Sequence, residues 1–242
     1  MYTIYVALFL IIYAIVSLPL YAYEYFLGKK DPRKKVASSQ KIVVRAFKMI
    51  LGGCRIKVEA RGLENIPKDT PVLYAANHRS DMDILIGYTT VPTLTGFVAK
   101  KELRKVPCIS RWMRYLNCVF LDRENPREGL KAILQGVDNI KNGYSMFIMP
   151  EGTRNHEKEM LPFKEGSLKM AEKTGCPIIP VAITGSDDLL EKQSPWIRPG
   201  KAIITYGKPV YVSELSKEER KQLTPMVQQI IKEMLDNQEN PM

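Results

Sequence analysis

Short apolar runs rich in β-branched and aromatic residues recur along the chain from residue 55 to residue 207. Each run has the length of a strand. Between two of them, residues 127–141 repeat apolar side chains at helical spacing and stop before Gly143, a good helix stop. Strands alternating with helices predict an α/β fold, with a central, mostly parallel or mixed sheet of about seven strands flanked by helices. The runs are RIKVEA (55–60), VLYAA (72–76), TGFVA (95–99), CVFLD (118–122), SMFIM (145–149), IIPVAIT (178–184) and AIITYG (202–207).

The beginning of the chain has a different pattern. No residue from Tyr2 to Tyr23 is charged, and this length is about what a helix needs to cross the hydrocarbon of a bilayer. A cleaved signal peptide is a poor match, because no basic residue precedes the apolar run. Pro19 interrupts the run, so a straight span and a kinked or re-entrant helix are both open.

Residues 38–53 predict a second helix, with apolar side chains near one face and Lys41, Arg45 and Lys48 roughly opposite. Such a helix lies on anionic lipid, or it packs on the domain with its lysines in solvent. The proximity of the apolar run favours lipid. Residues 1–53 are therefore predicted to form a membrane-anchoring segment of two helices, and residues 54–242 an α/β domain.

The net charge of +10 is concentrated beside the apolar run: between Gly28 and Lys57 ten basic residues accompany one acidic residue, Asp31. Basic residues next to a membrane segment usually mark the cytoplasmic side. The predicted location is therefore the cytoplasmic face of the cell membrane, with the lipid bilayer as a partner. Nucleic acid is an improbable partner, because no aromatic platform for bases accompanies the positive charge.

Cysteine spacing gives no sign of a metal site. The four cysteines, at positions 54, 108, 118 and 176, form no Cys-x-x-Cys pair. Neither a zinc site nor a disulfide framework is indicated, and a reducing compartment fits best.

The stretch NHRSDMD (77–83) follows the predicted strand VLYAA and contains one of only two histidines. On one continuous helix His78 and Asp83 would point about 140° apart and would not meet. If a helix begins with Ser80 as N-cap, the Asp83 carboxylate can turn back to His78. The aspartate would then fix the tautomer of the ring, and His78 would act as a general base. Ordinary helix capping, with His78 as a loop residue, is the alternative.

A second loop, PEGTRN (150–155), follows the predicted strand SMFIM. Gly152 allows close backbone approach to an anion, and the planar guanidinium of Arg154 suits a phosphate. Lys100 and Lys101 stand at another predicted strand end, and cations at one sheet edge suit a phosphate. Backbone N–H groups of residues 77–79 or Gly152 are candidates to stabilise an oxyanion.

Four blocks of the sequence resemble, in order and approximate spacing, the glycerolipid acyltransferase family, above all its bacterial 1-acyl-sn-glycerol-3-phosphate (lysophosphatidic acid) acyltransferases. The resemblance implies that His78 is the base and Asp83 orients it. It also implies that Glu151, Gly152, Thr153 and Arg154 bind the phosphate of the acceptor, together with Lys100 or Lys101. Arg123 either binds the acceptor or forms a structural ion pair with Asp122. The blocks are NHRSDMD (77–83), VFLDR (119–123), PEGTR (150–154) and CPIIPVAITG (176–185).

The reaction that the resemblance implies is transfer of a fatty acyl group from acyl-CoA or acyl carrier protein (acyl-ACP) to the 2-hydroxyl of lysophosphatidate, which gives phosphatidate. A thioester is already activated, so neither a cofactor nor a metal is predicted, and the chain has no Gly-x-Ser-x-Gly elbow for an acyl-enzyme. One alternative is the same chemistry on glycerol 3-phosphate or another lysophospholipid. Another is a binding protein, without turnover, whose basic segment is the functional part.

Overall fold

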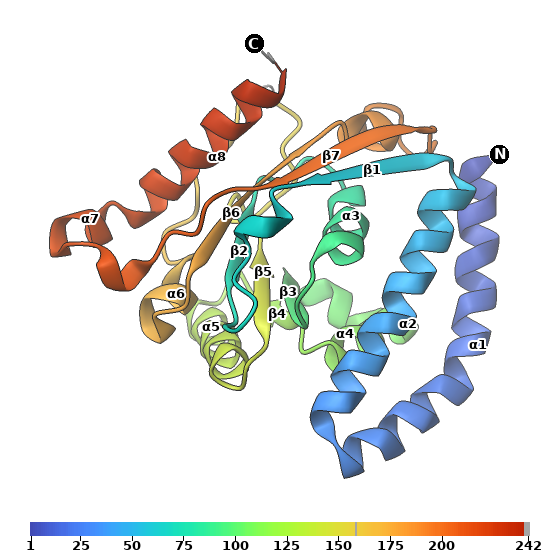
Figure 1. Cartoon of the computed structure of the whole chain (residues 1–242). Helices are drawn as coiled ribbons and strands as arrows, with labels where there is room; N and C mark the ends of the chain where they lie inside the picture. Colours follow the sequence, from blue (N-terminus) through green and yellow to red (C-terminus); the bar gives the residue numbers. More distant parts are fainter. Residues whose placement is uncertain (158, 240–242) are drawn as a thin grey trace.

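A computed structural model describes residues 1–157 and 159–239, and within them a sheet of seven strands lies between two layers of helices (Figure 1). The predicted α/β fold is confirmed. The strands are β1 (Ile56–Arg61), β2 (Leu73–Ala76), β3 (Thr95–Lys100), β4 (Val119–Leu121), β5 (Ser145–Ile148), β6 (Ile178–Thr184) and β7 (Gly200–Tyr206). The α-helices are α1 (Tyr2–Lys30), α2 (Pro32–Gly53), α3 (Met82–Thr90), α4 (Pro107–Tyr115), α5 (Pro126–Lys141), α6 (Lys169–Thr174), α7 (Lys217–Lys221) and α8 (Leu223–Glu239).

The sheet is mixed, with the strand order β1-β7-β6-β2-β5-β3-β4. Every neighbouring pair is parallel except β6 and β7. All the predicted runs are strands, with ends that differ by at most two residues. Because β2, β5, β3 and β4 are parallel neighbours, the loops that follow them lie along one edge of the sheet.

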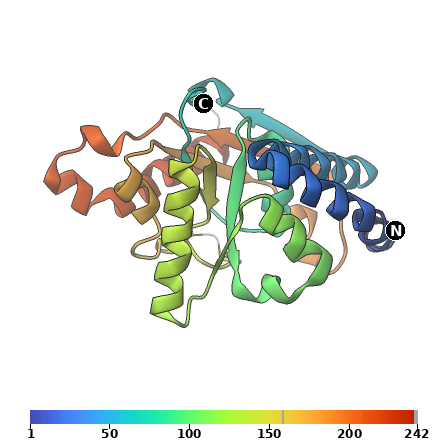
Figure 2. The same ribbon diagram turned by 90° about the horizontal axis from the view of Figure 1, so that it is seen from below.

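The two faces of the sheet bury alternate residues of the same strand. In β2, Leu73 and Ala75 belong to one apolar cluster, while Tyr74 and Ala76 belong to the other. This is the two-residue period of a strand that is buried on both faces. Helices α1 to α4 cover one face and α5, α6 and α8 cover the other; seen from below, the N-terminal pair (blue) and α5 (yellow-green) lie on opposite sides (Figure 2).

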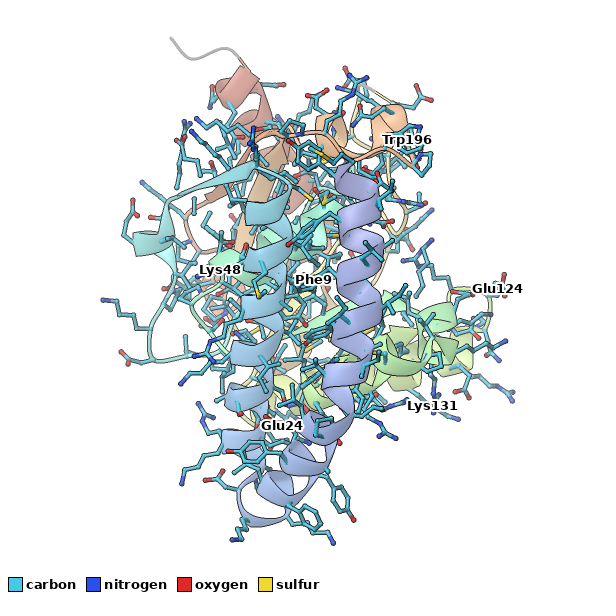
Figure 3. All side chains as sticks on the ribbon, turned by 90° about the vertical axis from the view of Figure 1, so that its right-hand side faces the viewer. Phe9, Glu24, Lys48, Glu124, Lys131 and Trp196 are labelled. Atoms are coloured by element: carbon cyan, nitrogen blue, oxygen red, sulfur yellow. The ribbon has the colours of Figure 1, made fainter. Side chains whose placement is uncertain are left out.

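The two N-terminal helices pack side by side (Figure 3). Helix α1 continues across Pro19 and bends toward its C-terminal end (Figure 1). Asp31 separates the helices, because its side chain accepts a hydrogen bond from Lys34 N at 2.9 Å and Pro32 starts α2, a favourable N-terminus. The buried Glu24 carboxylate of α1 accepts from the Ser38 and Ser39 hydroxyls of α2, at 2.6 and 3.0 Å.

The apolar face of α2 packs on the domain, so the preference for a lipid contact along this face is wrong. Val43 and Ile50 are buried in the cluster that contains Met82 and Ile86 of α3. The sequence alone could not decide this, because an amphipathic helix has the same pattern in both cases. The positive charges of residues 38–53 remain on the exposed side.

The outer surface of α1 is apolar and exposed. The helix is long and apolar enough to cross a membrane, and only 6% of its most apolar window is buried. A core helix of similar composition would be mostly buried. Helix α2 ends at Gly53, but the division into an anchoring segment 1–53 and a domain 54–242 stays a prediction. The exposed residues of α1 include Ile4, Leu8, Ile11, Ile12 and Ile15.

The C-terminal region contains two helices, and the break between α7 and α8 lies at Gln222. Helix α7 begins with a capping box between Ser216 and Glu219. Pro225 lies in the first turn of α8, where a missing backbone N–H removes no helical hydrogen bond.

One glycine controls how closely β3 approaches the chain before β4. A Cβ at Gly96 would overlap the backbone carbonyl of Asn117, whereas a Cβ at Gly52 would meet nothing within 4 Å. We expect Gly96→Ala to lower the free energy of unfolding by about 1–3 kcal/mol through overpacking. The matched change Gly52→Ala should leave it the same or slightly higher. Urea unfolding measures both, and equal stability of the two variants would contradict the argument.

Candidate active site

The residues predicted to be functional lie at the ends of four parallel strands. His78 follows β2, Lys100 ends β3, Arg123 follows β4, and residues 150–155 follow β5. These strands are neighbours in the sheet. In open α/β sheets, ligands bind outside the carboxyl ends of the strands, which is where these side chains are.

His78 and Asp83 are in contact. Nδ1 of His78 lies 2.9 Å from Oδ2 of Asp83, and the aspartate is fully buried. The same oxygen accepts from the backbone N–H groups of Arg79 and Ser80, each at 2.8 Å. Three groups therefore hold one carboxylate oxygen. A carboxylate at Nδ1 favours the tautomer with the proton on Nδ1, which makes Nε2 the basic nitrogen.

Helix α3 begins later than a Ser80 N-cap implies, because its first residue is Met82 and Asp81 precedes it. The first turn is tight: Asp83 N donates to Ser80 O at 3.1 Å, an i+3 bond. The Ser80 hydroxyl nevertheless accepts from Met82 N at 3.0 Å. Asp83 thus stays in the first turn and faces the entering chain.

Glu151 holds the backbone of His78. It is buried, and its two oxygens accept from His78 N at 2.8 Å and Leu161 N at 2.9 Å. On the other side of the histidine, Asn155 N donates to His78 O at 2.7 Å. Burial raises the pKa of Glu151, and the hydrogen bond from His78 N opposes this rise. The loop after β5 therefore fixes the position of the histidine; contact of Glu151 with substrate stays a prediction.

Three of the four amides expected to stabilise an oxyanion already have protein acceptors. His78 N donates to Glu151 and Arg79 N to Asp83. Gly152 N donates to Met149 O at 3.0 Å. Gly152 itself has φ +75°, a conformation that favours glycine, and it lets the chain turn so that Thr153 is exposed and Arg154 is half-buried.

Arg154 contacts two carboxylates. Its Nη1 lies 2.6 Å from Oδ2 of Asp81 and 3.3 Å from Oε1 of Glu191. Glu191 belongs to a short 3₁₀ helix, η4 (Glu191–Gln193), between β6 and β7. Arg154 is therefore next to the start of α3.

Lys100, Lys101 and Arg123 line a cavity of about 460 Å³ at the ends of β3 and β4. Nζ of Lys101 lies 2.6 Å from Glu124 and 3.0 Å from Asp122. These carboxylates raise the pKa of Lys101, so it stays charged at neutral pH. Asp122 thus pairs with Lys101. Arg154 does not line this cavity, so the predicted cations form two groups rather than one.

Three residues outside the predicted set also position the site. Asn77 is buried and exchanges two hydrogen bonds with Ile183 of β6, at 2.8 and 2.9 Å. Asn155 holds His78, and Glu191 contacts both Arg154 and Asp81. Asn77 and Asn155 stand inside or beside the quoted motifs, so the sequence could have identified them. Nothing in the sequence points to Glu191, because its partners are distant along the chain.

The sequence model of the acyltransferase family matches residues 57–184. This chain belongs to the acyltransferase family. The matched region contains His78, Asp83 and the loop after β5, so the family relation and the geometry concern the same residues.

Named relatives of this chain include 1-acyl-sn-glycerol-3-phosphate acyltransferases. The protein from Saccharomyces cerevisiae is 32% identical over 74% of this chain and 60% of its own length. The protein from Borreliella burgdorferi is 32% identical over 80% of this chain and 78% of its own. The crystal structure of the 1-acyl-sn-glycerophosphate acyltransferase PlsC from Thermotoga maritima has a TM-score of 0.81 and 31% identity, over 100% of this chain and 96% of that one. The chain thus spans less than two thirds of the yeast relative.

Replacing Asp83 by asparagine tests the orienting role. The amide can keep the backbone contacts, but it removes the charge that favours the Nδ1–H tautomer and stabilises the protonated ring. We expect acyl transfer to fall on the order of 10³-fold or more with the fold intact. Asp138→Asn, an exposed change on α5, should have no effect. A Asp83→Asn enzyme with near-normal turnover would exclude this role.

Proposed function

We propose that this chain transfers a fatty acyl group from an acyl thioester to the 2-hydroxyl of lysophosphatidate. The observation that carries the proposal is the contact between His78 and Asp83 at a sheet edge that also holds cations. The names of the relatives support the choice of acceptor. Acyl-CoA and acyl-ACP are both suitable donors, since each is a thioester.

The reaction needs one base. Nε2 of His78 takes the proton of the acceptor hydroxyl as its oxygen attacks the thioester carbonyl. A new carbon–oxygen ester bond forms and the carbon–sulfur bond breaks, with its electron pair on sulfur. The thiolate then takes the proton from the imidazolium. Asp83 stabilises the charged ring during these steps, and Glu151 keeps the ring in place through the His78 backbone.

The acceptor's phosphate requires cations near the base. Arg154, with its planar fork of N–H donors, is the proposed ligand beside α3. Lys100, Lys101 and Arg123 offer further positive charge along the same edge. Gly152 and Thr153 are also proposed to help bind the phosphate, because they form the turn that positions Arg154. No cofactor and no metal is part of the proposal.

Membrane association is part of the proposed function, because lysophosphatidate is held in a bilayer. The exposed apolar surface of α1 supports it. Lys29 and Lys30 follow this surface at the C-terminal end of α1, where they can meet anionic headgroups. The proposed location is the cytoplasmic face of the cell membrane.

The two histidines provide a matched test of the base. His156 is exposed and has no role in the proposal. With a radiolabelled acyl thioester and lysophosphatidate, His78→Ala should lose about 10²- to 10⁴-fold in turnover, the usual contribution of a general base. His156→Ala should keep full activity. Turnover by His78→Ala equal to that of the unchanged protein would refute the mechanism, and glycerol 3-phosphate as the better acceptor would refute the substrate.

Charges on the exposed face of α1 test the membrane contact. Ile11 and Ile15 are exposed one helical turn apart, and Leu130 is exposed on α5. Ile11→Glu with Ile15→Glu should shift the protein from floating vesicles to the soluble fraction, because each buried charge is costly in lipid. Leu130→Glu should float like the unchanged protein. Equal flotation of all three proteins would contradict attachment through α1.

A further inference from the structure

The two carboxylates that contact Arg154 differ in their freedom to move. The side chain of Asp81 is 65% exposed, whereas that of Glu191 is 5% exposed. Asp81 can therefore turn into water without breaking any packing. Glu191 cannot leave without taking a buried charge away from Arg154, which is costly.

Glu191 is also fixed by the chain around it. Its Oε1 accepts from Asp81 N at 2.8 Å in addition to Arg154. Further along the same segment, Thr3 of α1 donates to Pro195 O and accepts from Ile197 N, each at 2.9 Å. Trp196, between them, lies beside the N-terminal end of α1 (Figure 3). Glu191 is thus a positioning residue that keeps Arg154 beside α3.

Charge balance then limits what Arg154 can bind. One guanidinium with two carboxylates carries a net charge of −1, which repels a phosphate. The acceptor's phosphate can use the Nη1 donor only if one carboxylate withdraws, and Asp81 is the one that can. At 2.6 Å from Nη1, Asp81 occupies the position of a phosphate oxygen in a charge-assisted hydrogen bond.

We propose that Asp81 is an internal competitor for the anion site, displaced from Arg154 by the acceptor's phosphate while Glu191 stays. This inference rests on the proposed function, in which Arg154 binds that phosphate. Asp81 sets the affinity of the site: a weak, exposed ion pair is exchanged for a contact with the phosphate ester. Neutral or weakly charged headgroups cannot make this exchange, so the contact also favours phosphate monoesters.

The test replaces Asp81 by asparagine, which keeps the backbone contact with Glu191 but removes the competing charge. We expect the KM for lysophosphatidate to fall about two- to fivefold, the range of an exposed ion pair. Asp188→Asn is the matched control: Asp188 is 64% exposed and pairs with Lys192 rather than with an arginine. The KM of Asp188→Asn for lysophosphatidate should equal that of the unchanged protein. A higher or unchanged KM in Asp81→Asn would overturn the proposal, because a residue that only positions Arg154 raises KM when it is lost.

The same comparison in an Arg154→Gln background shows whether the effect passes through Arg154. There, Asp81→Asn should have no effect on KM; a persistent decrease would indicate a general charge effect and overturn the competition.

A readout without turnover separates this inference from the proposed reaction. Inorganic phosphate should raise the unfolding temperature of Asp81→Asn more than that of the unchanged protein, and Arg154→Gln should show only the non-specific effect of the salt. Tighter phosphate binding by Asp81→Asn in a protein without acyl transfer would support the competition and refute the reaction. If the protein transfers acyl groups but Asp81→Asn and the unchanged protein bind phosphate equally well, the reaction is supported and the competition is refuted.

Discussion

One carboxylate oxygen holds the reactive segment together. Oδ2 of Asp83 contacts Nδ1 of His78 and accepts hydrogen bonds from the backbone amides of Arg79 and Ser80, all within a short stretch of the chain. Hydrogen bonds from the chain replace the water that this buried oxygen has lost. Its orientation in turn requires the tight first turn of α3. The imidazole, its tautomer and the start of the helix are consequently set by the same interaction.

A second layer of contacts fixes the position of His78 in the fold. Glu151 and Asn155 clamp the His78 backbone from the loop after β5, and Asn77 joins β2 to β6. Two of the cations at the strand ends, Lys101 and Arg154, contact carboxylates. Acidic partners thus hold Lys101 and Arg154 in place, and in our proposal an anion that binds Arg154 competes with one of these partners.

The fold and the site differ in how far local sequence predicts them. Strand period and length located all the strands, and first-turn geometry placed Asp83 near His78, because both depend on neighbours in sequence. Strand order, the burial of the apolar face of α2 and the partners of Arg154 depend on contacts between distant segments. Arg154 was expected beside Lys100, but Asp81 and Glu191 contact it instead; Glu191 is 37 residues away and belongs to no motif. Local sequence could not show that Glu151 holds the His78 backbone, because its partner is a backbone amide 73 residues earlier.

Nitrogen NMR of the imidazole rings tests the central claim most directly. The chain contains two histidines, so a ¹⁵N-histidine-labelled protein gives two ring systems, and His156→Ala assigns them. The account predicts that neutral His78 carries its proton on Nδ1, with a hydrogen-bonded signal that Asp83→Asn abolishes. A neutral ring protonated on Nε2, or one whose signals do not respond to that substitution, would contradict it.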